Sequence, residues 1–205
     1  KRSGMIVDEW GTWYDVEPGT NPGFLYQQNT MRDAIVAGIN LNIFNKHADR
    51  VQMANLAQTV NVLQAVVLTD EEKMILTPTY WVFHMYKVHQ NATLLPISFT
   101  SNKYKQGNRE IDAVSVSASK DESGKIHITL VNTDLKNEQK IDTQLLGTKA
   151  KRVNGQILTT DKIDDHNSFE NPSKVNVKDF KGASLSNGNL SIKLPPSSVV
   201  MLELQ

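Results

Sequence analysis

The stretch GMIVDEWGTWY, residues 4–14, carries the strongest indication of how this chain folds. Residues 5–7 form a short apolar run of the kind that predicts a buried strand. Asp8, Glu9 and Trp10 would then emerge at the carboxyl end of that strand. Enzymes built as barrels of parallel strands keep their catalytic groups at this end. The stretch therefore predicts a parallel strand with a candidate catalytic carboxylate at its end.

The residue types in this stretch point to sugar chemistry. A carboxylate such as Glu9 can attack or stabilise an oxocarbenium-like centre, and flat apolar rings such as Trp10 and Trp13 pack on sugar faces. A strand-end glutamate is also commonly solvated or ion-paired, so the motif alone leaves both roles open. Successive side chains of a strand point to opposite sides, so we expect only one carboxylate to face a barrel axis. We interpret Asp8 as a structural partner, and Trp10 as the core tryptophan of the pair.

Helical patterns dominate the chain up to about residue 94. Thr30 and Asp33 have the spacing of a capping pair, and apolar residues recur at helical spacing from Met31 to Ile43. Thr77 and Pro78 predict the start of a second amphipathic helix. The apolar stretch 51–68, interrupted by polar residues, fits either a buried strand with its loop or a helix.

After residue 94 the apolar residues alternate with polar ones. The stretches 114–118 and 126–130 flank a turn at 121–124, which predicts a hairpin with one buried face. The alternation returns at 190–194, and the double proline after it predicts a break before the last strand. We therefore predict two domains, a barrel portion over residues 1–93 and a β-sandwich over residues 94–205, with a long surface loop from Asp161 to Lys174.

Composition narrows the classes of partner. The 205 residues are 39% hydrophobic, which is enough to bury a core, and 22 basic residues balance 22 acidic ones. A formal net charge of zero gives no general attraction to nucleic acid or to an anionic membrane. The chain has no cysteine, which excludes disulfides and Cys-ligated zinc and leaves the cellular compartment open. His47 and Asp49 lack further ligands at fixed spacing, so we expect no metal site and favour a structural ion-pair cluster there.

Three further stretches match one known family in the same order as the DEW segment. They are residues 42–70 (NIFNKHADRVQMANLAQTVNVLQAVVLTD), 75–96 (ILTPTYWVFHMYKVHQNATLLP) and 194–205 (LPPSSVVMLELQ). Together they resemble the C-terminal half of the family 51 glycoside hydrolases, the α-L-arabinofuranosidases. The resemblance covers nearly the whole chain.

The resemblance implies the C-terminal portion of a (β/α)8 TIM barrel followed by a β-sandwich domain. Members of the family use two glutamates, an acid/base after barrel strand 4 and a nucleophile after strand 7, and Glu9 matches the nucleophile. The chain begins at what resembles strand 7, so we expect a fragment that lacks the acid/base half of the barrel and is inactive on its own.

Two further residues take substrate-binding roles from the resemblance. Trp13 matches an aromatic residue that shapes the sugar subsite, and Gln58 matches a glutamine that hydrogen-bonds the arabinofuranose, a task for which an amide offers both donor and acceptor. Packing beneath the loop is the other role open to Trp13, and a satisfied buried amide is the other role open to Gln58. Gly11 departs from the family pattern, in which many members have Asn, and this predicts a more flexible loop.

The function implied is a retaining glycosidase that releases terminal α-L-arabinofuranosyl residues from arabinoxylan or arabinan. No metal or organic cofactor is implied, and the expected partners are the saccharide, the remaining half of the barrel and further copies of the chain. Two alternatives stay open. One is another furanosidase or an endoglucanase of the same family, and the other is a noncatalytic carbohydrate-binding or structural β-sandwich module.

Overall fold

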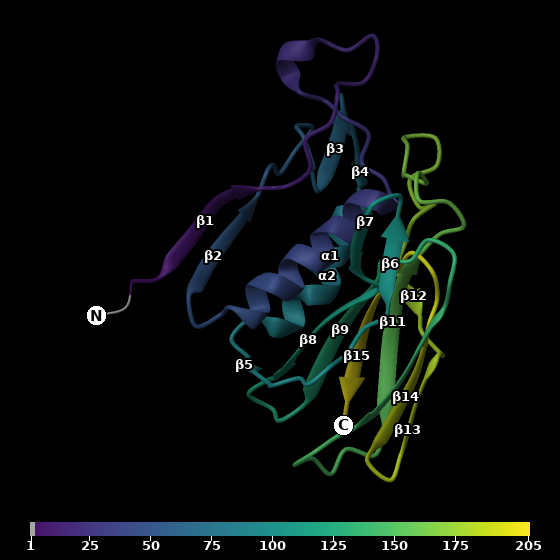
Figure 1. Ribbon diagram of the computed structural model, residues 1–205. Helices are drawn as coiled ribbons and strands as arrows, with labels where there is room; N and C mark the ends of the chain where they lie inside the picture. Colours follow the sequence, from purple (N-terminus) through teal and green to yellow (C-terminus); the bar gives the residue numbers. More distant parts are fainter. Residues whose placement is uncertain (1–2) are drawn as a thin grey trace.

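The computed structural model describes residues 3–205, and two packed sheets form its larger part (Figure 1). The first is antiparallel and has six strands, in the order β12 (Lys178–Asp179), β11 (Val153–Thr159), β15 (Ser198–Leu204), β9 (Ile126–Asn132), β8 (Val114–Lys120) and β5 (Thr93–Leu94). The second is a three-stranded antiparallel sheet, in the order β10 (Gln139–Gln144), β14 (Asn189–Leu194) and β13 (Ala183–Ser186).

The apolar core of the sandwich lies between these two sheets. Alternate residues of β8, β9 and β15 supply one side of it and alternate residues of β14 supply the other, as in Val116, Leu130, Leu202 and Ile192. The hairpin at 114–132 and the break at Pro195 are therefore confirmed. Burial of apolar side chains on the inner faces is the main favourable contribution to packing the two sheets together.

Two helices cover the opposite face of the six-stranded sheet. Helix α1 (Met31–Lys46) and helix α2 (Pro78–Tyr86) bury Met31, Val82 and Met85 against Val131 and other residues of the sheet. The predicted single buried face of the 114–130 hairpin is therefore wrong, because β8 and β9 are buried on both faces.

Close packing of α1 on the sheet depends on a glycine. A Cβ atom added to Gly38, in the middle of the helix, would lie 2.7 Å from Cγ2 of Val131. At that distance either the α1 backbone or the Val131 side chain would have to move. The absence of a side chain at Gly38 therefore allows the axis of α1 to approach β9.

A polar layer joins α1 and the 3-10 helix η2 (Lys87–His89) to the six-stranded sheet. Asn42 is fully buried; its Oδ1 accepts from the hydroxyls of Ser117 (2.8 Å) and Thr129 (2.8 Å), and its Nδ2 donates to Ser115 Oγ (3.2 Å). His89 contacts the Thr129 hydroxyl through Nε2, at 2.9 Å. The serines that alternate along β8 thus bind the helices instead of facing water.

Both predicted helix starts are confirmed. Thr30 caps α1, and its side chain and that of Asp33 form a reciprocal capping box. Thr77 caps α2, and Pro78 occupies the first turn. The loop 161–174 contains neither helix nor strand, and the carbonyls of Ile163 and Asp165 accept hydrogen bonds from the first-turn amides of α1.

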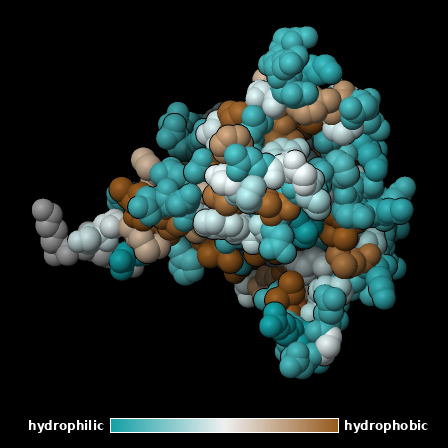
Figure 2. Space-filling view, turned by 90° about the horizontal axis from the view of Figure 1, so that it is seen from above, coloured by the Kyte–Doolittle hydropathy of each residue, from teal (hydrophilic) through white to brown (hydrophobic). Residues whose placement is uncertain are grey.

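A two-stranded parallel sheet projects from the helices. Strand β1 (Met5–Trp10) pairs with β2 (Val51–Leu56), and α1 connects them, so the three form a β-α-β unit. The stretch 51–68 is thus a strand followed by a loop. The prediction that residues 5–7 are buried is wrong for this chain, since Met5 is 44% and Ile6 60% exposed. We call this two-stranded sheet the β1–β2 arm. Brown atoms at the left of Figure 2, which mark hydrophobic residues, lie on it.

Three small elements complete the described chain. They are the hairpin β3 (Val67–Asp70) and β4 (Lys73–Leu76), the hairpin β6 (Lys103–Gln106) and β7 (Arg109–Asp112), and the 3-10 helix η1 (Pro22–Phe24). No sheet within residues 3–205 closes into a barrel. The same residues contain no helix with the length and apolar character of a membrane span.

Candidate active site

Glu9 lies near the carboxyl end of β1, and Gln58 lies just beyond the carboxyl end of β2. Trp10 pairs with Leu56 in the parallel ladder, and the Ala57 amide donates to the Trp10 carbonyl at 2.8 Å. Glu9 thus lies one residue before the end of β1 and Gln58 two residues beyond the end of β2, near the same ends of two neighbouring strands. Both are exposed. The structure thus brings the two sequence-predicted residues to one edge of the sheet, where a ligand could reach both.

Trp13 follows three residues after the end of β1 and is 69% exposed. Residues 3–205 therefore do not cover its ring. Its indole ring is available to a ligand or to another part of the protein. Asp8 is exposed as well, and the ladder is irregular between Val7 and Trp10. This irregularity interrupts the alternation that would place Asp8 and Glu9 on opposite sides.

Trp10 anchors the end of β1 on the two helices. Its ring meets that of Phe44 edge to face, with centroids 5.3 Å apart, and stacks on that of Phe83 with centroids 6.1 Å apart. Phe44 belongs to α1 and Phe83 to α2. The interpretation of Trp10 as a packing residue is therefore confirmed, and the residue next to Glu9 is held by apolar contacts on two sides.

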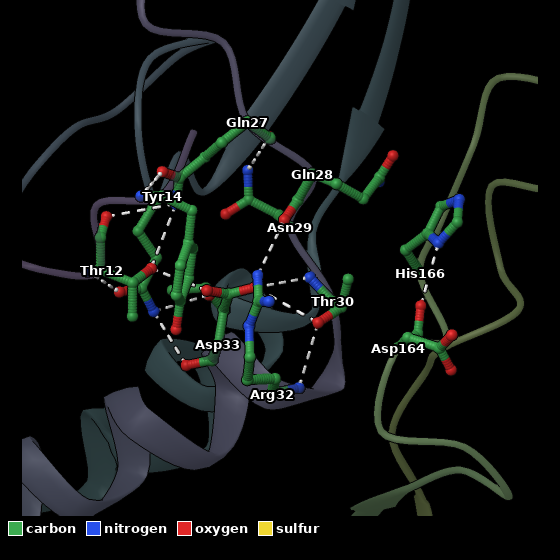
Figure 3. Close-up of polar contacts among 12 residues, drawn as sticks. Thr12, Tyr14, Gln27, Gln28, Asn29, Thr30, Arg32, Asp33, Asp164 and His166 are labelled. Carbon is green, nitrogen blue, oxygen red and sulfur yellow. Dashed lines mark hydrogen bonds and ion pairs between the residues drawn. The ribbon is translucent and has the colours of Figure 1, made fainter. Parts of the chain in front are cut away.

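Directly beneath this strand end lies a buried group of polar side chains that we call the Thr12 cluster, made up of Thr12, Gln27, Asp33, Gln64 and Thr79 (Figure 3 shows the first three). The Thr12 amide donates to Gln64 Oε1 at 2.9 Å, and its hydroxyl donates to Asp33 Oδ1 at 2.7 Å. Gln27 Nε2 donates to both the carbonyl and the hydroxyl of Thr12, each at 3.2 Å. Every polar group of Thr12 is therefore paired.

The cluster continues into the loop that follows Trp13. The Tyr14 amide donates to Gln27 Oε1 at 2.8 Å, and the Arg32 guanidinium carbon lies 3.7 Å from the centre of the Tyr14 ring. Burial raises the pKa of the Tyr14 hydroxyl, and nearby Arg32 opposes that change. In Figure 3, His166 and Asp164 of the 161–174 loop lie across from Gln28.

Asn61 and the KHADRV segment, residues 46–51, make contacts that stabilise neighbouring elements. Asn61 exchanges hydrogen bonds with Thr69, donating to its carbonyl and hydroxyl and accepting from its amide, and so fixes β3. His47 ends α1, and Arg50 accepts a hydrogen bond from Met5 through its carbonyl. Within residues 3–205, no group of three or more His, Cys, Asp or Glu side chains is placed to hold a metal ion.

Sequence reasoning missed Thr12, Gln27 and Gln64, and treated Asp33 only as a capping residue. The one signal for Gln64 was a polar residue inside the apolar run VLQAVV. Its partners are separated from it by 15 to 52 positions, and two of the three partner atoms belong to the backbone. Residue type and spacing carry no information about such contacts.

Comparison with known protein families gives a match over most of the chain. The family model described as "Alpha-L-arabinofuranosidase C-terminal domain" matches residues 8–198. The intracellular exo-alpha-L-arabinofuranosidase of Bacteroides ovatus is 52% identical over 206 residues, which cover 100% of this chain and 40% of that protein. The exo-alpha-(1->6)-L-arabinofuranosidase of Bifidobacterium longum is 26% identical, over 95% of this chain and 40% of that protein.

Solved structures of GH51 arabinofuranosidases also match this chain. The crystal structure of the GH51 arabinofuranosidase from Xanthomonas axonopodis pv. citri superposes with a TM-score of 0.97 at 48% identity, covering 98% of this chain and 41% of that one. The GH51 alpha-L-arabinofuranosidase from Thermotoga petrophila has the same fold, with a TM-score of 0.83 at 24% identity over 98% of this chain and 43% of that one. The present chain thus spans about two fifths of the length of the proteins it matches.

Proposed function

The chain belongs to the family of α-L-arabinofuranosidase C-terminal domains, and from this premise we propose that it is part of a retaining glycoside hydrolase. The proposed enzyme releases terminal α-L-arabinofuranosyl residues from arabinoxylan-type or arabinan-type saccharides. The observation that carries the proposal is the 52% identity to an exo-alpha-L-arabinofuranosidase along the whole chain. The exposed Glu9 at a parallel strand end gives that likeness a chemical basis.

We assign β1 and β2 to the last two strands of a (β/α)8 barrel. Their parallel pairing through α1 supports this assignment, because each strand of such a barrel is joined to the next by a helix. The exposed apolar side chains of the arm support it too. Ile6 and Met53 are 60% and 53% exposed, and further strands and helices of a barrel would cover them.

In the proposed mechanism Glu9 is the nucleophile. Its carboxylate attacks the anomeric carbon of the arabinofuranosyl unit, the glycosidic bond breaks, and a covalent glycosyl-enzyme forms. A second carboxyl group, supplied by the part of the barrel outside these residues, protonates the leaving oxygen and then deprotonates the water that hydrolyses the intermediate. In retaining enzymes the two carboxyl groups lie about 5 Å apart. This chemistry requires no metal or organic cofactor.

Gln58 and Trp13 are assigned to the substrate. The Gln58 amide can donate to one sugar hydroxyl and accept from another, and it follows the strand next to that of Glu9. The exposed Trp13 ring offers an apolar surface to the sugar ring. Association into homo-oligomers, also expected from the resemblance, is a separate proposal that light scattering on the purified protein would test.

A noncatalytic carbohydrate-binding module fits the structure less well. Binding modules of this kind need exposed rings side by side to stack on sugars. Of the four aromatic residues after residue 94, Phe180 is buried in the sandwich core, Phe169 packs against the small core near β3 and Tyr104 is half-buried, so Phe99 is the one that is exposed. Another furanosidase or an endoglucanase of the same family remains the enzymatic alternative, and activity on panels of aryl furanosides and glucans distinguishes it.

Substitution of Glu9 tests the proposal in the protein as it is encoded, after intact-mass measurement has established its full length. We expect Glu9→Gln to lower hydrolysis of an aryl α-L-arabinofuranoside by about a thousandfold or more, because the nucleophile is lost. Asp8→Asn is the matched control, since it neutralises the neighbouring exposed carboxylate, and we expect activity within a few-fold of wild type. Equal activity of wild type and Glu9→Gln would contradict the proposal.

A further inference from the structure

We propose that Gln64 is a positioning residue, which holds the end of β1, and with it Glu9, in register with the end of β2 and the first turns of both helices. The inference deepens the proposed function and rests on the assignment of Glu9 as nucleophile. Gln64 has no exposed surface and lies in the loop between β2 and β3. It would therefore act only through the residues that contact the substrate.

The side chain of Gln64 makes three hydrogen bonds to three different segments of the chain. Its Oε1 accepts from the Thr12 amide (2.9 Å), three residues after Glu9. Its Nε2 donates to the Asp33 carbonyl in the first turn of α1 (2.8 Å) and to the Thr79 hydroxyl in the first turn of α2 (3.1 Å). The chain segment after Glu9 is thus fixed to the start of each helix through a single amide group.

The backbone of Gln64 adds the connection to β2. Its amide donates to the Ala57 carbonyl at 3.0 Å, and the Ala57 amide donates to the Trp10 carbonyl at 2.8 Å. Gln58 follows Ala57 directly. Gln64 therefore contacts both the segment after Glu9, through Thr12, and the segment that contains Gln58, through Ala57. Gly11 allows these segments to lie close together, because a Cβ atom there would lie 3.2 Å from the Ala57 oxygen and 3.4 Å from Gln64 Oε1.

The donors and acceptor of the Gln64 amide match the hydrogen-bonding groups that surround it. The site offers one donor, the Thr12 amide, and two acceptors, the Asp33 carbonyl and the Thr79 hydroxyl. A neutral primary amide is the side-chain group that supplies one acceptor oxygen and two donor hydrogens together. An apolar replacement would leave the buried Thr12 amide without a partner, and the segment would have to move to satisfy it. A displacement of about 1 Å at a reacting group can cost on the order of a hundredfold in rate.

The test compares two buried amides in the full-length protein. Gln64→Met keeps the approximate volume and removes the three side-chain hydrogen bonds, and we expect kcat on an aryl α-L-arabinofuranoside to fall about ten- to a hundredfold while KM changes less than about threefold. Asn42→Leu is the matched control. Asn42 is equally buried and also makes three side-chain hydrogen bonds, but these join α1 to the six-stranded sheet. We expect it to lower the melting temperature and leave kcat within about twofold.

Gln64→Glu provides a second readout that a purely structural role would not move. Its protonated carboxyl keeps an acceptor for the Thr12 amide and one donor, whereas the ionised form has no donor. We expect kcat of this variant to decline with rising pH through an additional ionisation that wild type lacks. This variant also decides the matter if Gln64→Met does not fold.

The possible outcomes separate the two claims. Wild-type kcat in Gln64→Met, or an unaltered pH profile in an active Gln64→Glu, would overturn the positioning role. Equal losses of kcat in Gln64→Met and Asn42→Leu would overturn it as well, because general loosening of the fold would then explain both. A wild-type protein with no arabinofuranosidase activity, or an undiminished Glu9→Gln variant, would instead overturn the proposed function.

Discussion

At the scale of single residues, the surroundings of Gly11 show how closely the strand end is packed. Gly11 follows Trp10 and has a φ of +152°, a value that side-chain-bearing residues rarely adopt. A Cβ atom at Gly11 would make tight contacts with the Ala57 oxygen (3.2 Å) and with Gln64 Oε1 (3.4 Å). The resemblance, in which many members have Asn at this position, led us to expect a more flexible loop, and that expectation stays a prediction.

Gly11→Ala should therefore lower both stability and rate. The added methyl group requires the Ala57 carbonyl or the Gln64 side chain to shift by a few tenths of an ångström, and we expect kcat to fall about threefold. Gly19→Ala is the control, because Gly19 also has a positive φ (+85°) but has no atom within 4 Å of the position that a Cβ atom would take. Thermal unfolding and kinetics of both variants separate backbone strain, which they share, from contact with Gln64. A larger loss of kcat in Gly19→Ala would contradict this account.

The residue scale also shows what the sequence could reveal about the site. The strand-end positions of Glu9 and Trp10 were predictable because a short apolar run precedes them, and the contacts of Trp10 with Phe44 and Phe83 confirm its packing role. The catalytic role of Glu9 stays a prediction. Gln64 was not recognisable. Its contacts with Thr12 and Asp33 depend on where the loop between β2 and β3 passes, and local spacing does not determine that path.

At the scale of elements, helix α1 was the best predicted part of the chain. The spacing of Thr30 and Asp33 identified its first turn because a capping box uses local contacts only. The alternating serines of β8 gave the opposite result. Ser115 and Ser117 have the pattern of a solvent-facing side, yet they accept or donate hydrogen bonds under α1. Alternation shows that two faces differ in polarity, but it does not show what covers each face.

Loss of the α1 cap should cost a measurable part of the stability. We expect Thr30→Ala to reduce the free energy of unfolding by about 1 kcal/mol, because the Arg32 amide loses the Thr30 hydroxyl at 3.2 Å. The melting temperature should fall correspondingly. Thr30→Ser keeps the hydroxyl and should stay near wild type. Calorimetry of the three proteins checks the prediction, and equal melting temperatures for Thr30→Ala and wild type would contradict it.

At the scale of the whole molecule, the six-stranded sheet lies between the two main packed layers. The three-stranded sheet packs on one face and the helices of the β-α-β unit pack on the other. The sandwich and the two capped helices were predictable, because period and capping are local features. The double coverage of the sheet was not. The boundary between residues 93 and 94 stays a prediction, and β5 at that point already belongs to the six-stranded sheet.

Acid should weaken the contact between helices and sheet. Burial, with a smaller contribution from nearby His127, lowers the pKa of His89 from 6.5 to about 4. Between these values the unfolded chain binds a proton that the folded chain does not, so the stability contributed by neutral His89 is present above pH 6.5 and is lost as the pH falls toward 4. The slope should approach about 1.4 kcal/mol per pH unit within that window.

Urea unfolding between about pH 4 and about pH 7.5 measures this slope. His89→Gln removes the titrating group and should flatten the curve over that range, whereas Asn42→Leu disturbs the same polar layer and should keep the slope. A further loss is expected at lower pH, because the hydrogen bond with His127 holds the pKa of Asp121 below its usual 3.8. Protonation of Asp121 in the unfolded chain comes first, so its contribution is lost as the pH falls below that value. An unchanged slope in His89→Gln would contradict the assignment.

Val199 and Val200 are consecutive residues of β15, yet one belongs to the core under the helices and the other to the core of the sandwich. The strand as a whole must therefore match two sets of neighbours, one on each face. A chimaera that joined the helices of one relative to the sandwich of another would place mismatched side chains on both faces of one sheet. We expect the two parts to have been inherited together and to tolerate exchange only as a unit.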